Sequence, residues 1–269
     1  MNNRKIRVLA DLQENKLLKV IAGINNFDKE RVLKIVKSAE AMNVSCVDIS
    51  AREDIVTEAR EIAVNTALMV SSVKVEELER AIKLGVDMVE LGNFEALHDE
   101  GVFYSAEEVL AMATEIMNIK SLSDVLVSIT VPGHLSVKDQ VMLAEKLEEL
   151  KVDMIQTEGA SLVSTDKAAA LGQIEKARLT LANTIELSKV LSNTAIITAS
   201  GITPDTAKLA IAAGANGIGV GQYINKLESE LEMMAAITAL KESLNNPTGK
   251  STQNLSNTRL ASLDELELT

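Results

Sequence analysis

The sequence predicts a single (β/α)8 TIM barrel of the aldolase type, in the subclass of barrels that bind phosphate. Three observations support this fold class. Eight short apolar segments alternate with amphipathic segments of helical period. The repeating unit of about 28 residues suits successive strand–helix pairs in a parallel sheet. Glycine-rich segments follow the last two expected strands, where phosphate-binding barrels hold their ligand.

The 269 residues are expected to form three parts. Residues 1–18 form an N-terminal arm or helix packed at the bottom of the barrel, and residues 19–244 form the barrel itself. Residues 245–269 begin with a polar run rich in Asn, Ser and Thr, which is typical of a flexible tail. The expected strands are residues 20–25, 46–50, 68–72, 88–93, 125–131, 154–159, 195–201 and 217–222.

An internal similarity marks four of the expected helix-to-strand junctions. The segments are NVSCVD (43–48), GVDMVE (85–90), KVDMIQ (151–156) and GANGIG (214–219). A shared solution for ending a helix and starting a strand accounts for the similarity better than ancestral duplication does.

Composition excludes several classes of partner and site. The net charge of −12 and the 2% aromatic content argue against nucleic acid and against anionic membranes. One cysteine and two histidines exclude an intramolecular disulfide and a metal site built from several histidines. No apolar run is long enough for a membrane span, and no signal peptide is evident. We expect a cytoplasmic or organelle-stromal protein.

Carboxylates occupy three of the expected strands. Strand alternation directs Asp48, Glu90 and Glu158 into the barrel, at levels that rise toward its C-terminal mouth. Burial and mutual repulsion would raise the pKa of at least one of them, which suits a catalytic proton carrier. Alternatively, neighbouring hydroxyl and backbone donors satisfy each acid, and the acids merely close the barrel. No spacing requires a divalent cation, so no metal site is predicted.

Basic residues are rare in the expected strands. Lys19 is placed at the bottom of the first strand, and no Lys or Arg occurs within a later one. A Schiff-base lysine inside the barrel is therefore not expected.

The segment 199–226 predicts a phosphate site. The seventh strand ends in Ser-Gly and the eighth in Gly-Val-Gly-Gln, and glycine lets a phosphate approach the backbone. A short helix from about Ile224 would add its N-terminal dipole. The alternative is that the glycines only relieve crowding in the barrel. The predicted phosphate-binding residues are Ser200, Gly201, Gly219, Gly221, Gln222 and Lys226.

Four further residues are expected near the mouth. His134 follows the fifth strand in VPGHL and is a candidate catalytic residue. Asn25 and Asn93 end the first and fourth strands, and Thr130 ends the fifth. Their side chains could orient substrate oxygens. Cys46 is expected to be an inert packing residue.

Several segments resemble one known family in the same order. They include VIAGINNFD, VELGNFEAL, FYSAEEVL, SITVPGHL, QTEG, LGQIEKA, ITASGIT and AAGANGIGVGQYINKL. Together they are similar to the hypothetical chloroplast reading frame twenty-three family of cyanobacteria and algal plastids, over roughly residues 19–243. The resemblance implies an aldolase-type barrel without an established reaction, and it implies the plastid stroma if the gene is plastid-encoded.

Three functions remain open on the sequence. The leading hypothesis is an enzyme that acts on a small phosphorylated metabolite by carboxylate acid/base catalysis, as a lyase, isomerase or synthase. The second is an oxidoreductase whose flavin mononucleotide uses the same phosphate loops. The third is a non-catalytic phosphometabolite sensor or assembly protein. A homo-oligomer is also left open.

Overall fold

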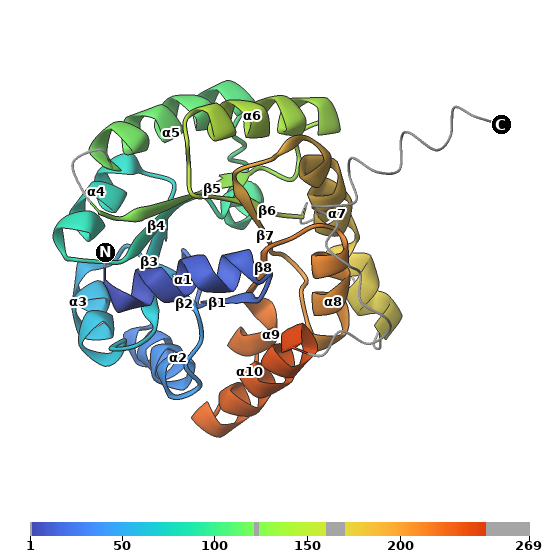
Figure 1. Ribbon diagram of the computed structural model, residues 1–269. Coiled ribbons are helices and arrows are strands. Elements are labelled where there is room, and N and C mark those ends of the chain that lie inside the picture. The colour runs from blue at the N-terminus through green and yellow to red at the C-terminus, as the bar shows by residue number, and fades with distance from the viewer. Residues whose placement is uncertain (1, 121–123, 160–169, 246–269) are drawn as a thin grey trace.

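Eight parallel strands close into a barrel in the computed structural model, which describes residues 2–120, 124–159 and 170–245 (Figure 1). Each strand pairs with its neighbours in sequence order, and β8 pairs with β1. The predicted (β/α)8 barrel is confirmed. The strands are β1 (Leu17–Ile21), β2 (Cys46–Ser50), β3 (Ala67–Ser72), β4 (Met88–Leu91), β5 (Leu126–Val131), β6 (Met154–Thr157), β7 (Ala195–Thr198) and β8 (Gly217–Val220).

Helices follow the strands and surround the barrel (Figure 1). Their outer ring is expected, because parallel neighbours need a crossover connection, usually a helix. The helices are α1 (Asn3–Gln13), α2 (Lys29–Ala41), α3 (Glu53–Ile62), α4 (Val75–Lys83), η1 (Phe94–Glu100), α5 (Ala106–Lys120), α6 (Val137–Glu149), α7 (Ala170–Val190), α8 (Pro204–Ala212), α9 (Gln222–Asn225) and α10 (Glu230–Asn245).

Local sequence signals fix where the outer helices begin and end. Asp28 and Ser136 accept main-chain N–H bonds that cap α2 and α6. The four similar junctions each start at a residue of positive φ, so a common helix stop explains their similarity. These residues are Asn43, Gly85, Lys151 and Gly214.

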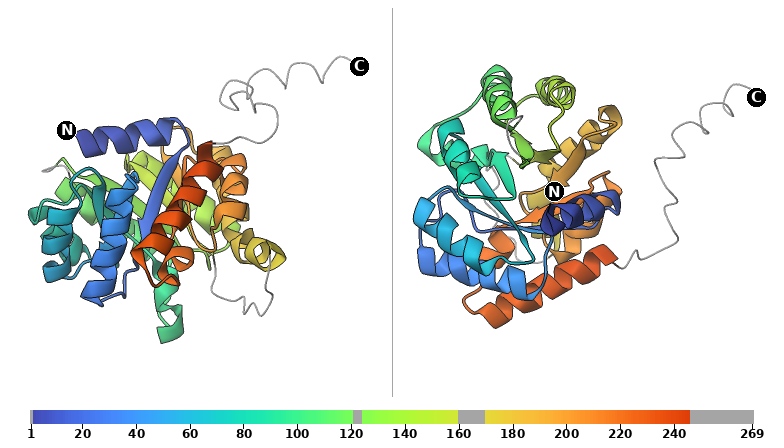
Figure 2. Two further views of the ribbon diagram at one scale, coloured as in Figure 1. Left: turned by 90° about the horizontal axis from the view of Figure 1, so that it is seen from below. Right: turned by 60° about the vertical axis from the view of Figure 1, so that its left-hand side comes forward.

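Helix α1 lies across the end of the barrel where the strands begin (Figures 1 and 2). Val8 and Leu12 pack there on inward side chains that include Cys46, Met88 and Met154. Burial raises the pKa of the Cys46 thiol to about 12, which leaves it an unreactive packing group. Of the expected tail, residues 246–269 lie outside the described residues.

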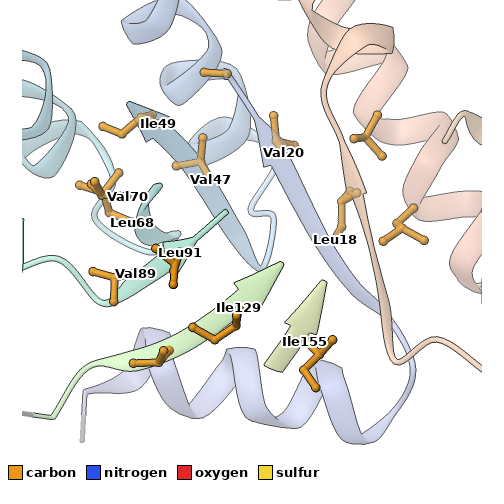
Figure 3. Close-up of a cluster of buried hydrophobic side chains, with 14 of the residues drawn as sticks. Leu18, Val20, Val47, Ile49, Leu68, Val70, Val89, Leu91, Ile129 and Ile155 are labelled. Carbon is orange, nitrogen blue, oxygen red and sulfur yellow. The ribbon is translucent and has the colours of Figure 1, made fainter. Parts of the chain in front are cut away.

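A second apolar cluster lies between the strands and the surrounding helices. Its strand residues include Val20, Val47, Ile49, Val89 and Ile155, which point to the outer face in Figure 3. They alternate with inward residues, so the predicted parity of β2, β4 and β6 is confirmed. Parity therefore sends the polar residues of these strands into the barrel.

Several strand boundaries differ from the sequence expectation. β1 spans Leu17–Ile21. It ends earlier than expected because the backbone turns at Gly23, whose φ is +109°. β4 and β7 end early because Asn93 and Ser200 have left-handed backbone conformations. The shift in β1 moves Lys19 from the bottom of the barrel to the middle of a strand.

Candidate active site

Lys19 lies at the centre of the barrel and is 1% exposed. Its Nζ is 2.7 Å from Glu90 Oε2 and 3.3 Å from Asp48 Oδ2, and it donates a 3.0 Å hydrogen bond to Gln156 Oε1. Burial alone lowers the pKa of a lysine, but the two carboxylates outweigh it and raise the pKa of Lys19. The ammonium group is therefore held charged.

The two carboxylates have further donors. Ser71 Oγ donates to Asp48 over 2.5 Å, and Ser128 Oγ donates to Glu90 over 2.7 Å. Burial raises the pKa of Asp48 from 3.8 to about 6, although Lys19 opposes this shift. The alternative that neighbouring donors satisfy these acids therefore describes Glu90 well. Asp48 Oδ2, in contrast, is buried without a hydrogen-bond partner and lies 3.3 Å from the Lys19 ammonium group.

Two side-chain amides link this buried network to the space above it. Gln156 Nε2 donates to Glu90 Oε1 over 2.9 Å and to Thr130 Oγ1 over 3.3 Å. Asn93 Nδ2 donates to the same Glu90 oxygen over 3.4 Å. Both amides line the main cavity, so the ion pairs below hold part of its floor in place.

The main cavity has a volume of about 520 Å³ and lies at the C-terminal mouth, where catalytic residues of this fold are found. It brings together residues from several strand ends and from the loops that follow them. Its lining comprises Ile21, Gly23, Asn93, Glu95, Ala96, Asp99, Gln156, Glu158, Gly159, Lys176, Ala199, Ser200, Gly201, Ile202, Gly221, Gln222 and Asn225.

The two glycine-containing loops meet at this cavity as expected. Ser200 and Gly201 both have positive φ, 70° and 75°. A Cβ on Gly201 would lie 2.9 Å from both the carbonyl carbon and the Cβ of Lys176, so the close packing against α7 requires glycine. Gly221 is the N-cap of α9, which begins at Gln222 rather than near Ile224.

Glu158 and Glu95 form the acidic side of the cavity. Glu158 is 2% exposed, and its oxygens accept main-chain N–H bonds of 3.3 Å from Glu95 and Gly133. Burial and the Glu95 charge raise the pKa of Glu158 well above its usual value. Burial also raises the pKa of Glu95, although the hydrogen bond from Ser200 lowers it. A raised pKa keeps a carboxyl group protonated to higher pH, which suits a general acid.

The expected cluster of three acids is only partly correct. Glu158 lines the cavity, whereas Asp48 and Glu90 lie below it, in the network of Lys19. The physical reason is the shifted first strand, which brings a lysine to the level of Asp48 and Glu90. Gln156 separates them from the cavity.

Four predicted binding residues do not line the cavity. Asn25 is exposed in the turn after β1, and Lys226 is exposed at the C-terminal end of α9. Gly219 instead makes room for other side chains: its Cβ would lie 3.0 Å from Ala199 Cβ and 3.2 Å from Gln156 Oε1. Thr130 is fully buried beside Gly92, where its Oγ1 accepts a hydrogen bond from Gln156.

His134 packs in an aromatic cluster outside the cavity lining. Its ring centroid is 5.1 Å from that of His98 and 5.3 Å from that of Phe103. His134 Nδ1 and His98 Nε2 are buried without a hydrogen-bond partner. Burial lowers the pKa of His98, which favours the neutral ring. The placement of His134 therefore gives no support to its predicted catalytic role.

The sequence interpretation left Lys19 out of the site, and it did not identify three charged residues of the cavity lining: Glu95, Asp99 and Lys176. The strand alternation that identified Asp48 would have found Lys19 once β1 was placed correctly. Glu95 lies on a 3-10 helix and Lys176 inside α7, so neither carries a strand-end signal.

The described residues contain neither a candidate metal site nor a helix that could cross a membrane. No three His, Cys, Asp or Glu side chains within residues 2–120, 124–159 and 170–245 are grouped to hold a metal ion. Over the same residues, no helix combines the length and the apolar character needed to cross a membrane.

The closed parallel barrel, its apolar bottom and the polar cavity at its mouth define the class: this is a (β/α)8 TIM barrel with its candidate site at the C-terminal ends of the strands. The chain belongs to the family described as "Protein of unknown function (DUF561)", which matches residues 1–250. "Uncharacterized protein ycf23" of Cyanophora paradoxa is 34% identical over 240 residues, 88% of this chain and 96% of that protein. Its namesake in Cyanidium caldarium is 32% identical over 238 residues, 88% and 94% of the two chains.

Solved structures share the fold at low sequence identity. A 3-hexulose-6-phosphate synthase superimposes with a TM-score of 0.62 at 15% identity, over 84% of this chain and 99% of its own. A thiamine phosphate pyrophosphorylase from Pyrococcus furiosus gives a TM-score of 0.55 at 16% identity, over 88% and 100%. These similarities support the barrel fold.

Proposed function

We propose that this chain binds a small phosphorylated metabolite in the cavity at the barrel mouth. One observation carries the proposal: the Ser200–Gly201 turn, the start of α9 and Lys176 of α7 all line one cavity with Glu158. The first N–H groups of a helix have no partner within it, and glycine lets an anion approach them. Lys176 takes the place of Lys226 as the cation of the site.

The proposed chemistry is proton transfer by Glu158. Its raised pKa lets it give a proton to a ligand oxygen or carbon and take one back. Lyase, isomerase or synthase chemistry fits such a group, and the named neighbours include a synthase and a pyrophosphorylase of phosphorylated compounds. Lys19 takes no covalent part in the proposal, because its ion pairs keep it protonated.

The phosphate requirement is tested by calorimetric titration of the full-length protein with ribose 5-phosphate and glycerol 3-phosphate, each beside its dephosphorylated partner. We expect binding of at least one phosphate ester and of neither free alcohol. Lys176→Met should weaken that binding about tenfold, the loss of one charge-assisted contact. Lys189→Met is the matched control, because Lys189 is on the same helix and is not part of the cavity lining.

Equal affinity for esters and alcohols, or equal weakening by both lysine variants, would overturn the phosphate site. Glu158→Gln separates an enzyme from a sensor: an enzyme keeps its ligand affinity and loses turnover of the ester it binds. Unchanged biological activity in that variant would favour the sensor. A flavin absorbance band in the purified protein would contradict both the acid/base enzyme and the sensor, and it would favour the flavin-dependent oxidoreductase. The proposed setting is the cytoplasm or plastid stroma, without nucleic acid or membrane as a partner.

A further inference from the structure

The predicted phosphate-binding hydroxyl group is already engaged by a carboxyl group. Ser200 Oγ donates a 2.6 Å hydrogen bond to Glu95 Oε2. Glu95 comes from η1 and Ser200 from the loop after β7, and both residues line the cavity. An anion bound to the Ser200–Gly201 turn would therefore lie against a carboxyl group.

The charges around Glu95 do not offset the repulsion between a bound anion and the Glu95 carboxyl group. Glu158, just after β6, faces it and accepts its main-chain N–H, and Asp99 follows on η1. Lys176 of α7 is the one basic residue in the cavity lining of the described residues. The histidine on η1, His98, packs on His134 and Phe103 instead. Acidic groups thus outnumber basic ones around the anion position.

An ionised Glu95 would oppose a doubly charged phosphate strongly. Like charges a few ångströms apart repel strongly where the surrounding protein displaces water. A proton between the two groups turns this repulsion into a hydrogen bond. Burial favours the protonated form of Glu95 before any anion arrives, since it raises the pKa of this carboxyl group.

We propose that Glu95 makes anion binding at the Ser200–Gly201 turn proton-linked: a phosphate group binds with one proton held between a phosphate oxygen and the Glu95 carboxyl group. The inference rests on the proposed function and adds the ligand form that the site selects, a phosphate monoester plus one proton. The proton comes from solution or from the singly protonated ester itself, and no covalent bond changes. Glu95 is thereby a specificity-determining residue.

Sulfate is the probe, because it stays a dianion without a proton of its own across the working pH range. Its binding to the full-length protein is measured by calorimetry in two buffers of different ionisation enthalpy, which gives the number of protons taken up. We expect uptake of about one proton per sulfate at pH 8 and an affinity that falls about tenfold per pH unit there, as one-proton linkage requires.

Glu95→Gln removes the charge and keeps the shape. It should bind sulfate with little proton uptake, with a flat pH profile, and about tenfold more tightly at pH 8. Glu100→Gln is the matched control, since Glu100 is an exposed residue of the same helix and is not part of the cavity lining. It should behave as the wild type does. Glu95→Ala gives a second test of proton uptake if the glutamine variant folds poorly.

The outcomes separate this inference from the proposed function. Sulfate binding without proton uptake, or the same uptake in both Glu95 variants, overturns the role of Glu95 and leaves the phosphate site standing. Failure of both the wild type and Glu95→Gln to bind sulfate or inorganic phosphate at any pH overturns the site itself.

Discussion

The ammonium group of Lys19 lies 2.7 Å from the Glu90 carboxylate, and both side chains are 1% exposed. Ions in such a place lose most of their hydration, so each depends on its partner. Glu90 in turn accepts the amides of Gln156 and Asn93, which line the cavity. Lys19 of β1 therefore has two roles: it stabilises the barrel interior, and through Glu90 it orders the floor of the candidate site.

Lys19→Met should destabilise the protein by about 3–5 kcal/mol, because it leaves the buried Glu90 and Asp48 carboxylates without a cation. The measurement is urea denaturation at neutral pH. Lys16→Met, at an exposed lysine three residues earlier, is the control and should leave the midpoint unchanged. The double variant Lys19→Met with Glu90→Gln should recover part of the loss. A single variant as stable as the wild type would contradict this role.

Asp48 should make folding stability fall as the pH rises from about 4 to about 6. Its pKa in the folded state, about 6, lies above the ordinary 3.8, so the folded protein holds this proton more tightly. The stabilisation is complete below the unfolded pKa and is lost as pH rises through the folded pKa. Denaturation at several pH values should give a flatter profile for Asp48→Asn than for the wild type.

Asp54→Asn is the control for that profile. Arg52 lowers the pKa of Asp54 to about 2, so its contribution has the opposite sign and is lost only as pH falls below the ordinary value. This variant should keep the wild-type decline between about pH 4 and 6. The same decline in Asp48→Asn would show that other carboxyl groups cause it.

Asp87→Asn should loosen α1 from the bottom of the barrel. Asp87 is 1% exposed and accepts hydrogen bonds from Asn2, Arg4, Arg60 and the main-chain N–H of Leu68. We expect a loss of about 3 kcal/mol and faster hydrogen exchange in α1. Asp99→Asn, at the opposite end of the barrel, should leave exchange in α1 unchanged. Unaltered exchange in both variants would contradict the anchoring role.

The fold was predictable because strand alternation and helix periodicity repeat around the barrel. Val47, Ile49 and Val89 pack outward as β-branched strand residues do in this fold, so their neighbours Asp48 and Glu90 had to point inward. The loops at Ser200 and Gly221 were predictable because glycine next to a strand end marks a close backbone approach.

The rest of the site depends on positions that the pattern does not fix. A shift of β1 by a few residues changed the level of Lys19, and with it the environment of Asp48 and Glu90. Glu95 reaches the cavity from a 3-10 helix with no strand register. In β7, Ala195, Ile197 and Ala199 face inward, so Thr198 faces α7 and shares a 2.6 Å hydrogen bond with Thr184.

The most direct test of the account is a crystal structure of the full-length protein soaked in selenate at low pH, where Glu95 holds a proton. Selenium gives an anomalous signal that locates the anion without prior assumptions. We expect a selenium peak in this cavity, with selenate oxygens within hydrogen-bond distance of Ser200 Oγ and of the main-chain N–H groups at Gly221 and Gln222. Selenate bound only at surface lysines, with this cavity empty of it, would contradict the phosphate site.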